Sequence, residues 1–335
     1  MSAGLASSLW PTPVAVIGVG NMGLAMALRL RDAGQAVRVH DRDASRVALA
    51  VAGGALAAAS PAAVASGCTL LIVAVVDAVQ TGQVLFGAPD GLTATAAATA
   101  AATATATATP GAITTLAPGA TVLLCPTIGP ADVERISARL AARGLGCIDA
   151  PMSGGPVRAR DGSMSLMVAC PDALWAQHRL VLRHLAAGLC HVGTRQGDGA
   201  RTKLVNNLLA AANLAAAAEV IALAQRLGLD AQQTLAVINQ SSGQSWIGTD
   251  RMARALTGDF APRAHCTLLA KDSALAMAMA AEAGVTPLLG GQAAAMFQAA
   301  LAAGYAAEDD GRLLSLVQAQ WGCAAPPKPP KPAAD

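Results

Sequence analysis

The chain has 335 residues, of which 54% are hydrophobic, 2% aromatic and 13% charged, and its net charge is +2. This length is enough for two domains or one large domain. A near-neutral chain without a dense basic run excludes nucleic acid as the main partner, because phosphate binding needs clustered lysine and arginine.

The seven cysteines occur singly and the five histidines form no H-x-x-x-H pair. We therefore expect buried reduced thiols and no metal site. Residues 1–13 lack the basic start and apolar run of a signal peptide. The apolar stretch 208–227 is interrupted by polar residues such as Glu219 and Arg226, which favours a buried helix over a membrane span. We expect a cytoplasmic protein with no membrane partner.

The first part of the chain alternates between strand and helix patterns. Residues 14–17 are an apolar run that ends in glycines, which predicts a buried strand. A helix is expected at 21–33 with Gly34 as its stop. Further elements are expected at 36–40 (strand), 46–51 (helix) and 70–76 (strand). This alternation is typical of a doubly wound parallel sheet.

Residues 93–110 interrupt the alternation and consist almost entirely of alanine and threonine. As one strand they would be far too long, and they carry no large side chain to bury. We predict a low-complexity insertion in a loop. The alternation then resumes with a strand at 121–125, a helix at 131–143, and strands at 147–150 and 164–169.

After about residue 195 only helical patterns occur. Helices are expected at 202–227, 231–239, 247–256, 268–284, 290–303 and 312–320. The prolines at 326–332 prevent helix and sheet. The sequence thus predicts an α/β fold in three parts: a Rossmann domain with a doubly wound parallel sheet over 13–195, an all-helical substrate and oligomerisation domain over 196–322, and a disordered tail over 323–335.

The segment Gly18-Val-Gly20-Asn21-Met22-Gly23 fits G-x-G-x-x-G and lies between a predicted strand and a predicted helix. Gly18 would permit a tight turn, Gly20 would let the backbone approach a pyrophosphate, and Gly23 would let helix and strand pack closely. The helix N-terminus would supply N–H donors, including those near Asn21 and Met22. A glycine turn without a ligand is the alternative.

Further cofactor contacts are expected at the ends of the second and third strands. Asp41 can accept hydrogen bonds from both ribose hydroxyls of NAD, whereas Arg42 could hold a 2′-phosphate. NAD is therefore expected and NADP is possible. Val75 and Val76, which end the third predicted strand, are also expected to bind the cofactor.

Two later segments carry polar groups suited to a small acid. The loop with Ser153, Gly154 and Gly155 offers a hydroxyl and free N–H groups for a carboxylate, although a plain turn explains it equally well. Lys203 and Asn207 are four residues apart and share a helix face. The helix dipole and partial burial would lower the pKa of Lys203 from about 10.4 toward that of a general acid or base. Asn207 could bind a substrate hydroxyl. The alternative is a surface lysine beside an asparagine inside the helix.

Over residues 14–303 the chain resembles the β-hydroxyacid dehydrogenase family. That family includes 3-hydroxyisobutyrate dehydrogenase, tartronate semialdehyde reductase and threonate-type sugar-acid dehydrogenases. Four motifs in the family's order carry the resemblance: Gly18-x-Gly20-x-x-Gly23, Asp149-Ala-Pro-Met-Ser153-Gly-Gly155, Gly199…Lys203-x-x-x-Asn207 and Lys271-Asp272. The resemblance implies a fold like that of 6-phosphogluconate dehydrogenase.

The resemblance also implies roles for the matching positions. Lys203 would be the catalytic acid/base, and Asn207 would bind substrate. Ser153, Gly154 and Gly155 would hold its carboxylate. Lys271 and Thr127 would contact the cofactor.

Two positions bear on the substrate. Pro126 stands where the family usually has serine, so one hydroxyl is missing and the substrate stays open. Residues 242–246 with Arg251 look closer to the 3-hydroxyisobutyrate and threonate-type branches than to the tartronate semialdehyde branch. Trp246 could equally be a core residue.

We therefore expect an enzyme that moves a hydride between NAD(P) and the hydroxyl carbon of a small β-hydroxy acid such as 3-hydroxyisobutyrate, giving a semialdehyde or keto acid. The alternatives are a four-carbon sugar-acid dehydrogenase acting on threonate or erythronate, an imine reductase on the same scaffold, and a non-catalytic NAD(P)-binding protein. The alanine-rich helices favour a homodimer or homotetramer through the helical domain.

Overall fold

The structure is a computed structural model that describes residues 10–87 and 110–323. The chain divides into two compact units, Met1–Lys203 and Leu204–Asp335. The predicted insertion at 93–110, except Pro110, lies outside the described residues. So do the predicted tail beyond Cys323 and the first nine residues.

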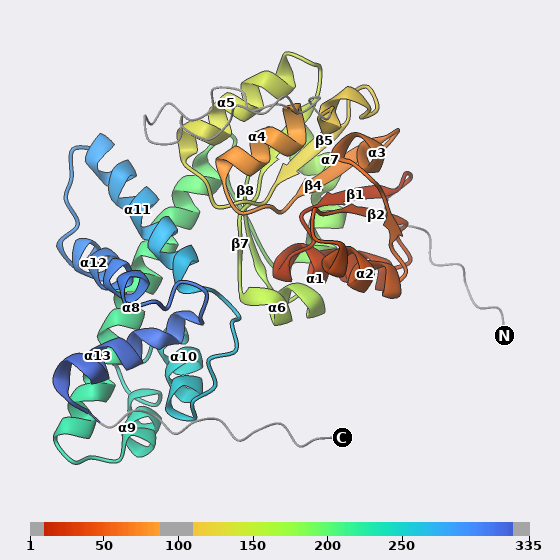
Figure 1. Cartoon of the computed structure of the whole chain (residues 1–335). Coiled ribbons are helices and arrows are strands. Elements are labelled where there is room, and N and C mark those ends of the chain that lie inside the picture. The colour runs from red at the N-terminus through yellow and green to blue at the C-terminus, as the bar shows by residue number, and fades with distance from the viewer. Residues whose placement is uncertain (1–9, 88–109, 324–335) are drawn as a thin grey trace, which may run out of the picture. The chain divides into compact units, whose positions relative to one another are not determined.

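The first unit is built on one sheet of nine strands in the order β3-β2-β1-β4-β5-β6-β8-β7, with β9 beside β8 (Figure 1). The strands from β3 to β6 are all parallel. Their bounds are β1 Val14–Ile17, β2 Val37–His40, β3 Leu56–Ala57, β4 Leu70–Val73, β5 Thr121–Leu124, β6 Gly146–Asp149, β7 Met152–Ser153, β8 Ser165–Ala169 and β9 Gly188–Gly193. The order 3-2-1-4-5-6 is that of a Rossmann fold, so the predicted fold class is confirmed.

Helices cover both faces of this sheet (Figure 1). Their bounds are α1 Asn21–Asp32, α2 Ala44–Ala52, α3 Pro61–Ala65, α4 Ala78–Phe86, α5 Pro130–Ala141, α6 Gly155–Asp161 and α7 Asp172–Leu185, with a short 3-10 turn at Ala112–Thr114.

Alternate residues of each central strand enter opposite hydrophobic layers. Val14 and Val16 pack with α1, α2 and α7, while Ala15 and Ile17 pack with α3, α4 and α5. A parallel strand buried on both faces has to be apolar throughout. This explains the continuous apolar runs from which the strands were predicted.

One edge of the sheet departs from the predicted parallel arrangement. β8 runs antiparallel to β6 and to β7, and parallel to β9. Only two residues separate β6 from β7, so the two strands run in the same direction and both pair antiparallel with β8. The strand predicted at 70–76 ends at Val73, and the helix predicted at 46–51 extends over Ala44–Ala52 because Asp43 caps its first turn. Seven elements were not predicted from the sequence, namely α3, α4, α6, α7, β3, β7 and β9.

The described part of the second unit is helical, apart from an isolated bridge between His265 and Asp309. Its helices are α8 Asp198–Arg226, in which the division between the units falls, α9 Ala231–Ile238, α10 Trp246–Leu256, α11 Cys266–Glu282, α12 Leu288–Ala302 and α13 Leu313–Trp321. The hydrophobic core of the second unit contains buried residues of α8, such as Leu214 and Ile221, together with Phe297 and Leu314. All six helices were predicted, with ends that differ by a few residues.

Helix α8 is long and apolar enough by length and composition to cross a membrane, and 44% of its most apolar window is buried. The core helix of a water-soluble protein passes the same test.

All seven cysteines are free thiols. Cys190 is exposed and Cys323 is half-buried, so these two differ from the buried thiols that were expected.

Candidate functional site

The glycine-rich turn after β1 has the geometry that its sequence predicts. Gly18 has a φ of +88°, and a Cβ there would lie 2.7 Å from the carbonyl oxygen of Ala74. A Cβ at Gly23 would lie 1.8 Å from the carbonyl oxygen of Gly18. Both positions therefore require glycine, one for its conformation and both for close packing.

Gly20 is different, because a Cβ built there meets nothing within 4 Å. Gly20 is the N-cap of α1, no side chain caps this helix end, and its first turn has no acidic residue. The unpaired N–H groups and the positive end of the helix dipole therefore face an open space. A dinucleotide pyrophosphate fits this cradle in charge and in hydrogen bonding.

Asp41 follows β2 and is tied to the glycine turn. Its Oδ2 accepts a hydrogen bond from the Val19 N–H at 2.8 Å, and its Oδ1 accepts one from the Asp43 N–H at 2.9 Å. A carboxylate has about four acceptor positions, so ribose hydroxyls can still bind. Arg42 is exposed beside it.

Strand register brings several predicted residues to one edge of the sheet. Ile17, Val73, Leu124 and Asp149 lie side by side on β1, β4, β5 and β6. The residues that follow them leave the sheet at its carboxyl edge, where ligands bind in open α/β folds. These segments contain the glycine turn, Val75, Val76 and Thr127.

Within this group, Val75 lies nearest the turn, since its Cγ1 would be 3.0 Å from a Cβ on Gly18. Val76 is 49% exposed and Thr127 is half-buried. Pro126, beside Thr127, is buried.

The loop after β6 carries the predicted carboxylate-binding residues. Ser153 lies on β7 and pairs with Ser165 of β8. Gly154 and Gly155 both have positive φ, +125° and +74°, and they begin the short helix α6. All three are half-buried. The positive φ values explain why glycine occupies both positions. Ser153 itself is held in place by the pairing of β7 with β8.

Lys203 lies in the second turn of α8 and is only 7% exposed. The alternative of a surface lysine is therefore wrong. The start of its helix is held by Asp149, whose Oδ2 accepts a hydrogen bond from the Ala200 N–H at 3.0 Å. Burial raises the pKa of Asp149 to about 7, against the opposing effect of backbone hydrogen bonds from residues 197, 199 and 200.

Asn207, 8% exposed, lies one turn further along α8 and has protein partners on both sides of its amide. Its Nδ2 donates to Asp272 Oδ2 at 2.6 Å, and its Oδ1 accepts from Asn206 Nδ2 at 3.0 Å. Lys271 Nζ lies 2.7 Å from the other carboxylate oxygen of Asp272. The buried carboxylate of Asp272 thus joins the two predicted residues of the second unit, Asn207 and Lys271.

Sequence reasoning gave no role to Asp149 or Asp272, although both stand in the quoted motifs. Asp149 begins its motif, four residues before Ser153, and Asp272 ends its motif beside Lys271. That placement was the available signal, but their partners are 51 and 65 positions away in the chain.

Arg251 and Trp246, singled out in the sequence, belong to α10. Trp246 is 53% exposed, so the core alternative is wrong. Arg251 is buried and hydrogen-bonds to Asp250 and Asp310. Burial raises the pKa of Asp310 to about 6, although Arg251 opposes the shift. This arrangement is a structural ion network rather than a ligand site.

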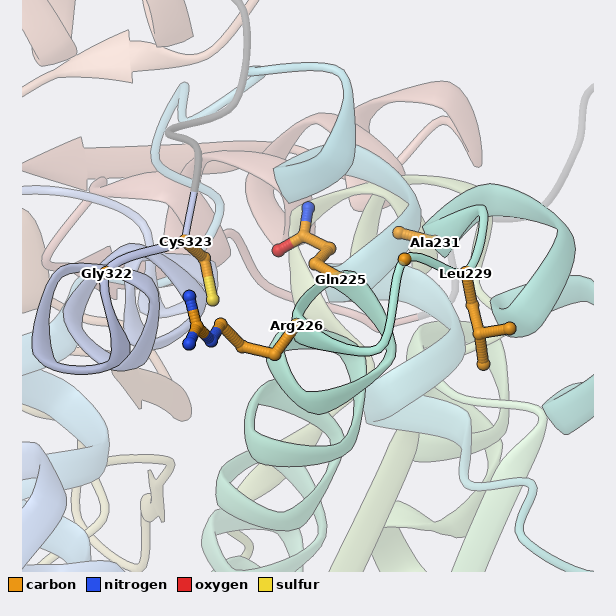
Figure 2. Close-up of a pocket in the computed structure, with 7 residues that line it drawn as sticks. Gln225, Arg226, Leu229, Ala231, Gly322 and Cys323 are labelled. Atoms are coloured by element: carbon orange, nitrogen blue, oxygen red, sulfur yellow. The ribbon is translucent and has the colours of Figure 1, made fainter.

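A pocket of about 370 Å³ lies in the second unit, where α8 and α13 end and α9 begins (Figure 2). Arg226 and the Cys323 thiol point into the same space, and Gln225 lies above them. None of the predicted site residues lines it, and it holds no acid. The described residues contain no group of three or more histidine, cysteine or acidic residues that could hold a metal ion.

Two family models match the chain. A model described as the NAD binding domain of 6-phosphogluconate dehydrogenase matches residues 13–193. A model described as the NAD-binding domain of NADP-dependent 3-hydroxyisobutyrate dehydrogenase matches residues 197–317.

Individual proteins are similar over nearly the whole chain. An L-threonate dehydrogenase from Cupriavidus necator is 33% identical over 303 residues, which are 90% of this chain and 95% of that protein. A 3-hydroxyisobutyrate dehydrogenase from Pseudomonas aeruginosa is 32% identical over 316 residues, 92% and 97% of the two chains. A crystal structure of 3-hydroxyisobutyrate dehydrogenase from Salmonella typhimurium has a TM-score of 0.80 at 31% identity and covers 91% and 99%.

Proposed function

Because the chain belongs to the β-hydroxyacid dehydrogenase family of NAD(P)-dependent oxidoreductases, we propose that Lys203 is the acid/base of its hydride transfer. The observation that carries this proposal is the burial of Lys203 near the start of α8. Lysine is among the most exposed residue types and is buried almost only where its ammonium is paired, so a buried lysine in this motif supports a specific role.

The proton balance of the reaction follows from that role. Bound NAD(P) supplies a nicotinamide that accepts hydride in oxidation and returns it in reduction. In oxidation the amine of Lys203 takes the proton of the substrate hydroxyl, and in reduction its ammonium returns that proton.

The substrate carboxylate is assigned to the loop after β6. The Ser153 hydroxyl and the N–H groups of Gly154 and Gly155 are the proposed donors. Two consecutive glycines with positive φ support this assignment, because such a turn can direct backbone N–H groups toward one anion. Fixing the carboxylate fixes the distance from the substrate hydroxyl to its proton acceptor.

Asn207 is proposed to bind the substrate hydroxyl. Its amide is held by Asp272 and Asn206, yet one N–H and one lone pair remain available. Lys271, paired with Asp272, is proposed to reach the cofactor.

We propose that NAD is the preferred cofactor and that the residues of the glycine turn, Val75, Val76 and Thr127 contact it. Asp41 supports NAD, because its carboxylate is fixed beside the turn by two backbone N–H groups. A carboxylate there accepts ribose hydroxyls and repels a 2′-phosphate. Arg42 is the residue that would permit NADP.

The proposed substrate is a small β-hydroxy acid of the 3-hydroxyisobutyrate kind. L-Threonate is the second candidate, favoured by the similarity to the Cupriavidus necator enzyme. The test is reduction of NAD or NADP, followed by absorbance, with 3-hydroxyisobutyrate, D- and L-glycerate, threonate, erythronate and L-serine. Cyclic imines with NADH and NADPH complete the panel. Activity on imines alone, or tight NADH binding with no turnover, would contradict the proposal.

A homodimer or homotetramer through the second unit completes the proposal. Four apolar residues of α8 lie on one helix face and are 44–62% exposed: Val205, Leu209, Val220 and Leu223. The same face of a second copy would cover this stripe by symmetric helix packing. The seven free thiols support a cytoplasmic location.

A further inference from the structure

The carboxylate of Asp149 connects two elements of the first unit. It ends β6, is 1% exposed, and accepts the Ala200 N–H of α8 at 3.0 Å. Backbone hydrogen bonds from Gly197 and Gly199 also favour its charged form. A buried carboxylate needs hydrogen-bond donors, and the first N–H groups of a helix need an acceptor. The Asp149 carboxylate and the start of α8 therefore meet each other's hydrogen-bonding requirements.

The contact between β6 and α8 is unusually close. A Cβ at Gly199 would lie 2.6 Å from the carbonyl oxygen of Met167 and 2.9 Å from that of Asp149. Only glycine fits there, so the first turn of α8 rests directly on the ends of β6 and β8. The position of this turn is thus set by the strands and by the carboxylate between them.

Asp149 is linked closely to both of the groups that the proposed function assigns to opposite ends of the substrate. Four residues after it in the chain comes Ser153, and the helix that it anchors carries Lys203 in its second turn. We propose that Asp149 is a positioning residue for the hydride-transfer reaction, which holds Lys203 at a fixed place relative to the carboxylate-binding loop. This inference rests on the proposed function.

The surroundings of Asp149 let its charge change near neutral pH. The groups that face it are the thiols of Cys125, Cys147 and Cys170 and the carboxylate of Asp198. Burial raises the pKa of all three thiols, so they stay neutral. Asp198 is a like charge. When Asp149 takes a proton, the N–H groups at the start of α8 lose their anionic acceptor, and the hydrogen bond that holds this turn becomes weaker.

The test compares Asp149→Asn with Asp198→Asn. Both variants remove a carboxylate from the start of α8, but Asp198 pairs with Arg195 and Arg201 instead of anchoring the helix to the sheet. For Asp149→Asn we expect kcat to fall at least tenfold, with the Kd for NADH within twofold of wild type. In the reduction direction, where Lys203 has to be protonated and therefore limits the rate only on the basic side, we also expect the acid limb of the kcat profile near pH 7 to disappear. Asp198→Asn should keep that limb.

A second variant and a measurement without substrate keep the inference testable. Asp149→Ser retains an oxygen acceptor for the helix start and adds no bulk; it should also lose the acid limb. Amide exchange protection of residues 199–203, measured at pH 8 where Asp149 is charged, should be lower in Asp149→Asn than in wild type and unchanged in Asp198→Asn. If wild type oxidises no hydroxy acid, the proposed function fails, and the exchange result still decides the anchoring. Three results would overturn the inference. The first is an acid limb that both Asp149 variants retain, and the second is an acid limb that Asp198→Asn loses to the same extent. The third is amide exchange protection in Asp149→Asn equal to that of wild type.

Discussion

Replacing Gly20 by alanine separates cofactor binding from folding. The added Cβ meets no atom within 4 Å, and the φ of Gly20 is −63°, which alanine adopts without strain. The unfolded chain loses freedom on this change, so we expect stability to stay the same or rise by about 0.4–1 kcal/mol.

The same Cβ would occupy the space assigned to the pyrophosphate. Displacing the phosphates from the N–H groups of α1 should weaken NADH binding roughly 10- to 100-fold, or about 1.4–2.8 kcal/mol. The assay is a fluorescence titration with NADH alongside thermal unfolding.

Gly23→Ala is the matched control, because its Cβ would lie 1.8 Å from the Gly18 carbonyl oxygen. We expect this variant to lose both stability and binding. Wild-type affinity for NADH in folded Gly20→Ala would refute the assignment of the cradle.

Three further predictions follow from other parts of the structure. Asp149 has a pKa of about 7 in the folded protein against an ordinary 3.8, so folding favours its protonated form. The resulting gain in the free energy of unfolding is fully present below pH 3.8 and is lost as pH rises through 7. Urea unfolding should therefore show wild type losing roughly 3 kcal/mol more than Asp149→Asn between pH 5 and pH 8, and equal losses would contradict this pKa. Asp272→Ala should raise the KM for the hydroxy acid about tenfold or more in steady-state assays, because the Asn207 amide loses a charged hydrogen-bond partner. An unchanged KM would contradict the assignment of Asn207 as a substrate-binding residue. Leu223→Glu should dissociate the oligomer in sedimentation, whereas Val157→Glu, at an exposed apolar position of the first unit, should leave it intact; the same mass for both variants would exclude the α8 face as the interface.

Features that depend on neighbours in the chain could be predicted from the sequence. The turn at Gly18 requires a positive φ, and the strand β4 is a continuous apolar run buried on both faces. The long helix α8 ends at a glycine, Gly228, with a φ of +76°. Such local requirements leave a direct mark on residue type.

Features that depend on distant partners could not be predicted. The edge strand β9 is half-buried rather than buried, so it lacks an apolar run. Asp149 and Asp272 acquire their roles from Ala200 and Asn207, which folding alone brings to them. The exposed fraction of Lys203 likewise depends on packing and not on its sequence neighbours.

The most direct test of the proposed chemistry is the turnover of Lys203→Ala with the best hydroxy acid of the panel, measured beside Val205→Ala, an exposed position on the same helix. The account predicts that NADH formation falls by roughly 10²–10⁴ in Lys203→Ala, with the Kd for NADH within twofold of wild type. It predicts near-normal turnover in Val205→Ala. Wild-type-like turnover in Lys203→Ala would contradict the assignment of Lys203 as the proton carrier.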